Sequence, residues 1–76
     1  MRLVRVIWHD THGDMGWLAP CDFSVEPRVI ESVGWLVIPS KANHVTVALD
    51  WDAAAGLYNG VAHIPHACVV EVTDLQ

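Results

Sequence analysis

The sequence predicts an all-β protein, either a small five-stranded antiparallel barrel or a strongly bent sheet. Five segments are rich in β-branched and aromatic residues, and the clearest of them alternate apolar with polar side chains, as a strand with one buried face does. Glycines and prolines lie between or inside these segments, where they mark turns and bulges. No stretch shows the long amphipathic pattern of a helix. These three observations favour short strands joined by turns.

The first two expected strands cover residues 2–10 and 29–39. Both faces of the first strand are partly apolar, which predicts that both are covered. Residues 11–28 contain glycines, prolines and scattered aromatics, typical of an ordered loop, and one short turn of helix is expected at 21–25. Gly34 interrupts the second strand and predicts a bulge or a close backbone approach.

The remaining three strands are expected at residues 44–51, 57–64 and 68–75. The first of these has the cleanest alternation in the chain. Residues 52–56 before the fourth strand form a loop or one helical turn stopped by glycine. A proline-marked corner precedes the last strand, because proline cannot donate to a sheet ladder.

Five short strands, a long first loop and a tight corner before the last strand resemble the layout of SH3-like and Sm-like barrels. An OB-type barrel or an open meander packed into a dimer fits the same strands nearly as well. The whole chain, residues 1–76, is expected to form a single β domain, because 76 residues leave room for one small core.

Composition predicts a homo-oligomer in the cytoplasm. Hydrophobic residues make up 53% of the chain, a high load for so small an interior, and subunit interfaces would bury the surplus. The start of the chain lacks a secretory signal pattern, and its two cysteines are too few for a disulfide framework. No apolar run approaches the roughly 20 residues that cross a bilayer, so no membrane partner is expected. A net charge of −5 without any basic run argues against duplex nucleic acid.

The five histidines raise the alternative of a metal-binding protein. Four of them fall in two close pairs, and two aspartates lie beside the first pair, so a zinc-type ligand set can be drawn. Neither pair has the i, i+4 helical spacing of strong zinc motifs, and no cysteine pair would complete the site. Metal binding is therefore the weaker hypothesis. Its residues are His9, Asp10, His12, Asp14, His63 and His66.

Catalysis is not expected, and neither is a cofactor. Ser32 and Ser40 lack the residues of a nucleophile elbow, and no catalytic-cysteine signature surrounds Cys21 or Cys68. A concave site walled by two layers of structure is also hard to build from so few residues. A binding protein is the better interpretation of this sequence.

Four tryptophans in 76 residues are the feature that favours binding most strongly. Trp8 and Trp51 each follow apolar residues on one strand face, which predicts a place in the core. Trp17 lies in a glycine-flanked loop, and Trp35 follows Gly34, where a missing side chain lets a flat ligand or a partner backbone approach. We expect these two indoles to stack on a ligand or to anchor a protein interface.

Arg28 and Arg5 are the candidates for pairing with an anionic group, since a guanidinium binds phosphate or carboxylate bidentately. The alternative is an ordinary salt bridge to a neighbouring acid such as Glu31. A turn or bulge at Gly60 adds polar groups that could face a pocket. The predicted ligand-binding set is Trp17, Trp35, Arg28, Arg5, Asp10 and Asn59.

The strings WHD, GWL, SVGWLV, GVAHIP and VVEVTDL together resemble a recurring pattern in short uncharacterised proteins encoded by bacteriophages. The matching residues are Trp8, Asp10, Gly16, Trp17, Ser32, Gly34, Trp35, Leu36, Gly60, Ile64 and Pro65. The resemblance implies a phage origin and a short β-rich fold, and no activity. By analogy in size, oligomeric state and aromatic content, the chain is similar to phage proteins that sequester nucleotide immune signals. The first hypothesis is therefore a non-enzymatic anti-defence protein that binds a nucleotide-derived signal at a subunit boundary, and the second is a protein-interaction or structural module.

Overall fold

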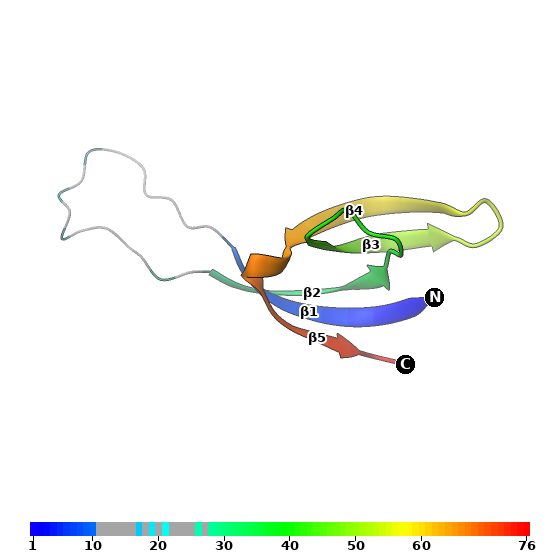
Figure 1. The fold of residues 1–76 in the computed structure, drawn as a ribbon, viewed down its shortest axis with the longest axis horizontal. Helices are drawn as coiled ribbons and strands as arrows, with labels where there is room; N and C mark the ends of the chain where they lie inside the picture. Colours follow the sequence, from blue (N-terminus) through cyan, green and yellow to red (C-terminus); the bar gives the residue numbers. More distant parts are fainter. Residues whose placement is uncertain (11–16, 18, 20, 22–25, 27) are drawn as a thin grey trace.

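The computed structural model describes residues 1–10, 17, 19, 21, 26 and 28–76. The described part of the chain contains five strands and one short 3-10 turn, which confirms the all-β prediction (Figure 1). No helix in this part is long and apolar enough to span a bilayer. The elements are β1 (Arg2–Asp10), β2 (Arg28–Leu36), β3 (His44–Asp52), β4 (Leu57–Pro65), η2 (His66–Cys68) and β5 (Val69–Asp74).

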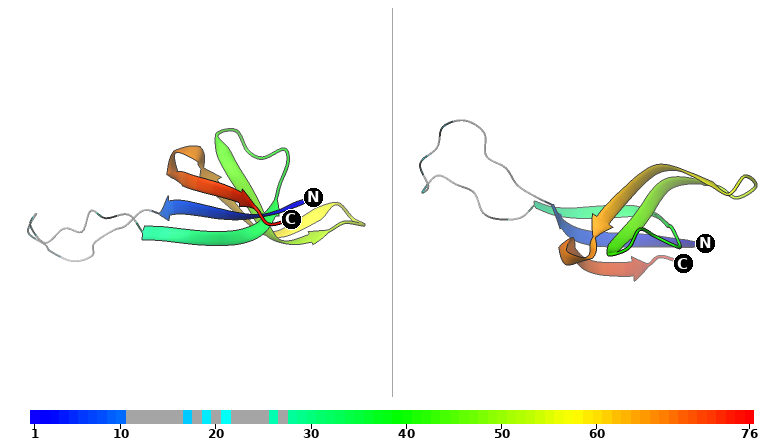
Figure 2. Two further views of the ribbon diagram at one scale, coloured as in Figure 1. Left: turned by 90° about the horizontal axis from the view of Figure 1, so that it is seen from below. Right: turned by 45° about the horizontal axis from the view of Figure 1, so that its top comes forward.

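All five strands belong to one antiparallel sheet in the order β4-β3-β2-β1-β5. The outermost strands, β4 and β5, have no pairing with each other among the described residues, so the sheet is open and a closed barrel is not confirmed. The sheet is bent instead. In Figure 2 the β3–β4 hairpin crosses β1 and β2 at a steep angle, which is the second of the two forms that the sequence predicts.

The predicted strand bounds agree closely with the structure except at the end of β2. This strand ends at Leu36 rather than at Pro39. The Val37 amide still donates to the Thr46 carbonyl at 2.9 Å, but Pro39 has no N–H with which to continue the ladder. The helical turn predicted at 21–25 lies largely outside the described residues.

The core lies where the bent sheet folds over itself. Val4 and Val6 from β1 meet Val47 from β3 and Ile64 from β4, and all four side chains are buried. Fully burying such a side chain contributes about 1.5–3 kcal/mol. The partly buried residues packed around this cluster are Trp8, Leu36, Val45, Cys68 and Val69.

The β3–β4 hairpin closes through a turn that its sequence specifies. The Asp52 carboxylate accepts hydrogen bonds from the amides of Ala54 and Ala55, each at 3.1 Å. Gly56 follows at φ 68°, a left-handed conformation that costs glycine little, and its amide donates to the Asp52 carbonyl at 2.8 Å. The turn fixes β4 beside β3 over the whole length of the hairpin.

Candidate functional site

The candidate site begins where β2 and β3 separate. β2 pairs with β1 along all nine of its residues, but with β3 only through Trp35↔Ala48 and Leu36↔Val47. The two strands are therefore close at the C-terminal end of β2 and diverge toward its N-terminal end. This divergence opens a cleft between the two halves of the bent sheet.

Gly34 sets the point of closest approach. A β-carbon at this position would lie 2.6 Å from the Ala48 carbonyl oxygen, nearer than any real side chain sits to backbone. The predicted close approach is confirmed, and the neighbouring group is the backbone of β3. The alternative of a bulge is not seen in the pairing with β1, because Val4 lies opposite Gly34 in an unbroken register.

A cavity of about 220 Å³ lies in the cleft. Pockets for drug-sized ligands typically measure about 300–1,000 Å³, so this cavity fits a group the size of one amino-acid side chain better than a whole nucleotide. Its walls are almost wholly apolar and come from β2, β3 and β4. The lining residues are Ser32, Val33, Val47, Ala48, Leu49, Gly60 and Ala62.

Leu49 forms a wall of the cavity that remains largely exposed. Its side chain lies over Gly60, where an added β-carbon would come within 2.8 Å of the leucine Cδ1. Gly60 itself has φ 66°, a conformation that other residues rarely adopt. Because 70% of the Leu49 surface is open to solvent, this wall offers apolar area that a bound group could cover.

Ser32 is the single polar side chain in the lining, and it is already engaged. The Trp8 indole N–H donates to its hydroxyl oxygen at 3.0 Å. A serine hydroxyl that accepts one hydrogen bond can still donate its own hydrogen. The cavity therefore offers one donor within an apolar surround. The part-buried place of Trp8 against the core agrees with the structural role predicted for it.

The edge of β2 next to the cleft carries backbone groups that no described strand pairs with. Along an antiparallel strand, successive residues direct their backbone N–H and C=O groups to opposite sides. The Val37 amide donates to Thr46 of β3, so the odd-numbered residues of β2 direct these groups to the β3 side. No described strand pairs with Val29, Glu31 or Val33 on that side. The free edge thus runs directly into the cavity, which Val33 also lines.

Arg5 forms the salt bridge that the sequence left as an alternative to ligand binding. Its Nη1 lies 3.3 Å from Glu31 Oε1, with both side chains partly exposed. The Arg5 Nε is buried and has no hydrogen-bond partner among the described residues. The pair lies on the face of the sheet opposite to Val4 and Val6.

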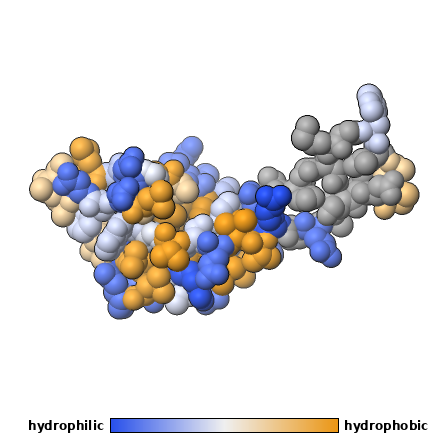
Figure 3. All heavy atoms as spheres, turned by 180° about the vertical axis from the view of Figure 1, so that it is seen from behind, coloured by the Kyte–Doolittle hydropathy of each residue, from blue (hydrophilic) through white to orange (hydrophobic). Residues whose placement is uncertain are grey.

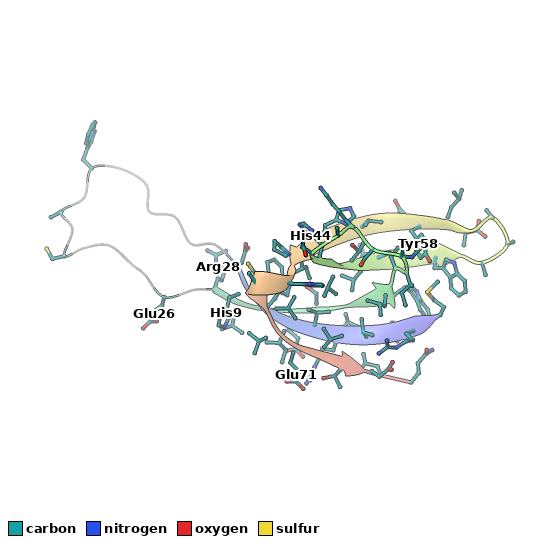
Figure 4. The ribbon with its side chains drawn as sticks, in the orientation of Figure 1. His9, Glu26, Arg28, His44, Tyr58 and Glu71 are labelled. Atoms are coloured by element: carbon teal, nitrogen blue, oxygen red, sulfur yellow. The ribbon has the colours of Figure 1, made fainter. Side chains whose placement is uncertain are left out.

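The predicted aromatic and anion-binding residues do not converge within one chain. Trp35 packs against Trp51, with ring centroids 5.8 Å apart. Arg28 lies at the other end of β2, about 23 Å away along the strand at roughly 3.3 Å per residue. Trp17 is wholly exposed. Figure 4 shows Arg28 close to His9 at one end of the sheet and Tyr58 near the other.

Asn59 and Asp10, the other two residues of the predicted ligand-binding set, lie on different strands. The Asn59 side-chain amide donates to Asp50 across the β3–β4 hairpin at 3.2 Å, which explains this residue without a ligand. Asp10 ends β1 opposite Arg28. Of the residues that the sequence associated with a pocket at this hairpin, Gly60 does line the cavity.

The histidines pair differently from their spacing in the sequence. His63 contacts His44 edge to face at 6.5 Å, and its Nδ1 lies 2.8 Å from the buried Thr46 hydroxyl. His12 and Asp14 lie outside the described residues. Within the described ranges, no group of three or more His, Cys, Asp or Glu residues could hold a metal ion.

No protein family, curated protein or solved structure matches this chain. The bacteriophage resemblance stays a prediction from the sequence. The sequence does not single out the apolar residues that line the cavity, because each resembles an ordinary strand residue. Only the two glycines, Gly34 and Gly60, signalled close packing around the site.

Proposed function

We propose that this protein is a non-enzymatic binding module that takes one apolar group into the cleft between β2 and β3. The observation that carries the proposal is the cavity, side-chain-sized and apolar, at the place where the strands diverge. The ligand chemistry is an aliphatic or aromatic group. A partner protein's side chain and a small apolar molecule both supply it.

Exposed apolar surface around the strands supports a binding role. Figure 3 shows hydrophobic side chains at the surface among hydrophilic ones on the face that it presents. Near the cleft, Val33, Leu49 and Val61 are all exposed. Covering such surface contributes about 25 cal/mol for each Å² removed from water.

The nucleotide-sequestering hypothesis is a proposal with a further requirement. Trp35, Arg28 and Trp17 would have to meet across a subunit boundary, because one chain keeps Trp35 and Arg28 at opposite ends of β2. A nucleotide phosphate also finds little to pair with in an apolar cavity. The anti-defence role depends on that version of the site, whereas a phage origin rests on the sequence resemblance alone.

The proposal is tested by filling the cavity. Ala62→Leu places a larger side chain in its lining, and Ala55→Leu makes the same change in the exposed hairpin turn. We expect the neutral dye Nile red to bind the wild type with a blue-shifted emission and to move the Gly60 amide resonance. Ala62→Leu should weaken binding at least about tenfold, a loss of about 1.4 kcal/mol, and Ala55→Leu should leave it unchanged.

Equal binding by both variants would contradict the proposed site. A parallel titration distinguishes the ligand classes: tryptophan fluorescence is followed with cyclic dinucleotides and cyclic ADP-ribose isomers. Saturable quenching by one of these would favour the nucleotide hypothesis over an apolar ligand.

A further inference from the structure

We propose that a second copy of this chain pairs with the free edge of β2, in an antiparallel two-fold register centred on Glu31. This inference goes beyond the proposed function and does not depend on it. It assigns the interaction surface to residues 29–33 and names the partner as an identical subunit.

The backbone supplies the first argument. Val29, Glu31 and Val33 each present one donor and one acceptor on the side facing away from β1, and no described strand uses them. A row of free N–H and C=O groups is a template for another strand. Antiparallel pairing centred on Glu31 would satisfy all three residues of both copies.

The side chains make this edge self-complementary. A two-fold axis at Glu31 places Val29 opposite Val33 of the partner subunit, and the same contact repeats on the other side of the axis. Both valines are among the exposed large hydrophobic residues, at 65% and 52%. Directly opposite β-branched residues stabilise a strand pair by about 0.2–1 kcal/mol. The same patch on both subunits is what a two-fold dimer requires.

Charge at the centre is balanced by Arg5. Two glutamates facing each other would repel, but each Glu31 already lies 3.3 Å from an arginine of its own chain. The axis therefore brings together two negative and two positive side chains. Their arrangement is neutral as a group, although each chain carries a net charge of −5.

The other edges of the sheet are less suited to pairing. β4 carries Gly60 in a left-handed conformation and ends at Pro65, which has no N–H. β5 has six residues and an irregular register opposite Ile7 and Trp8. Bulges and short strands protect an edge from a second chain. Of the described strands, β2 is the one that combines an unbroken register with unpaired positions along its other side.

The first experiment measures mass on the full chain. Sedimentation equilibrium should give twice 8.4 kDa with a concentration-dependent return to monomer. Val29→Pro removes an edge donor without removing a bond to β1, and it should weaken the dimer at least about tenfold. Val72→Pro makes the same change at an exposed position in the regular part of β5, where alternation directs the amide away from β1, and it should leave the mass unchanged. Circular dichroism checks that both variants fold.

The second experiment tests the register. In a background with Cys21→Ser and Cys68→Ala, Glu31→Cys should form a disulfide-linked dimer on mild oxidation, because opposite residues have α-carbons about 5.5 Å apart. Val29→Cys should not, since its counterpart would lie four residues further along the partner strand. Equal cross-linking by both variants would overturn the register.

Two results would overturn the dimer itself. One is a monomeric mass at every concentration, together with a Glu31 amide protected from hydrogen exchange, which would mean that the chain covers its own edge. The other is dissociation by Val72→Pro and not by Val29→Pro, which would move the interface to β5. Val33 belongs to both surfaces, so dye binding is measured on the monomeric Val29→Pro variant as well: binding there tests the cleft without the dimer, and the two proposals fail separately.

Discussion

The two halves of β2 lie in different surroundings although they form one continuous strand. Near its C-terminal end the strand pairs with both β1 and β3, and Gly34 is buried against the β3 backbone. Toward its start, residues 28–33 pair with β1 and with no other described strand, and Val29 and Val33 are exposed. One strand thus joins both halves of the sheet at its C-terminal end and leaves an edge that no described strand pairs with at its N-terminal end.

The contrast explains why a chain of 76 residues leaves apolar side chains exposed on β2. The buried cluster is small, and it draws on β1, β3 and β4 rather than on the start of β2. The start of β2 contributes no residue to this cluster, although Val6 lies beside it, opposite Ser32. It leaves Val29 and Val33 exposed.

Gly34→Ala should have the largest effect on folding, because the new β-carbon would overlap the Ala48 carbonyl and push β2 from β3. We expect a loss of about 3 kcal/mol or more in the free energy of unfolding, measured by urea denaturation. Gly56→Ala is the control. It meets no atom within 4 Å and should cost only about 1 kcal/mol, for its left-handed φ. Equal losses would show that the close approach is not what joins the halves.

The second-largest effect on the free energy of unfolding is expected at a valine of the core, compared with a valine at the edge of β2. Val6→Ala removes methyl groups from a fully buried side chain and should cost about 2 kcal/mol, from lost burial and the cavity left behind. Val33→Ala removes the same atoms from a half-exposed edge and should cost less than about 0.5 kcal/mol in the monomer. Thermal unfolding at low protein concentration compares them. A larger loss for Val33 would place the edge within the core.

The sequence predicted what local pattern determines and missed what depends on the bend. Alternation located the strands, and Gly34 indicated a close approach before its neighbour was known. The cavity could not be predicted, because Val33, Leu49 and Ala62 come together only when β3 and β4 cross over β2. The sequence placed Trp35 and Arg28 in one ligand-binding set at a subunit boundary, and β2 holds them at its opposite ends within one chain, because an extended strand separates residues quickly.

The histidines and tryptophans show the same limit. Neighbours in sequence suggested His63 with His66, whereas strand pairing brings His63 to His44 and Thr46. Trp51 was assigned to the core by its face and instead packs against Trp35, partly exposed. Such contacts depend on which strands pair and in which register. Neither can be inferred from a single sequence whose strand order is unknown.

Trp8→Phe tests the side-chain hydrogen bond between Trp8 of β1 and Ser32 in the open half of β2. The change keeps an aromatic ring against the core but removes the donor to Ser32. We expect a loss of about 1 kcal/mol in the free energy of unfolding. Trp17→Phe is the matched control, since Trp17 is wholly exposed and its loss should not be measurable. A neutral Trp8→Phe would mean that the Ser32 hydroxyl finds a replacement donor.

Glu31→Gln should have the smallest effect, and it separates folding from association at the free edge. Arg5–Glu31 at 3.3 Å and Arg2–Asp74 at 2.9 Å are both partly exposed ion pairs. Each should contribute less than about 0.5 kcal/mol to the monomer and lose most of that near 1 M salt. Asp74→Asn is therefore the control for Glu31→Gln in chemical denaturation at low protein concentration.

If Glu31→Gln costs clearly more than Asp74→Asn there, Glu31 stabilises the isolated chain beyond its ion pair. If the two differ only at high concentration, the difference belongs to association, because the proposed dimer places Glu31 at its axis and Asp74 away from it.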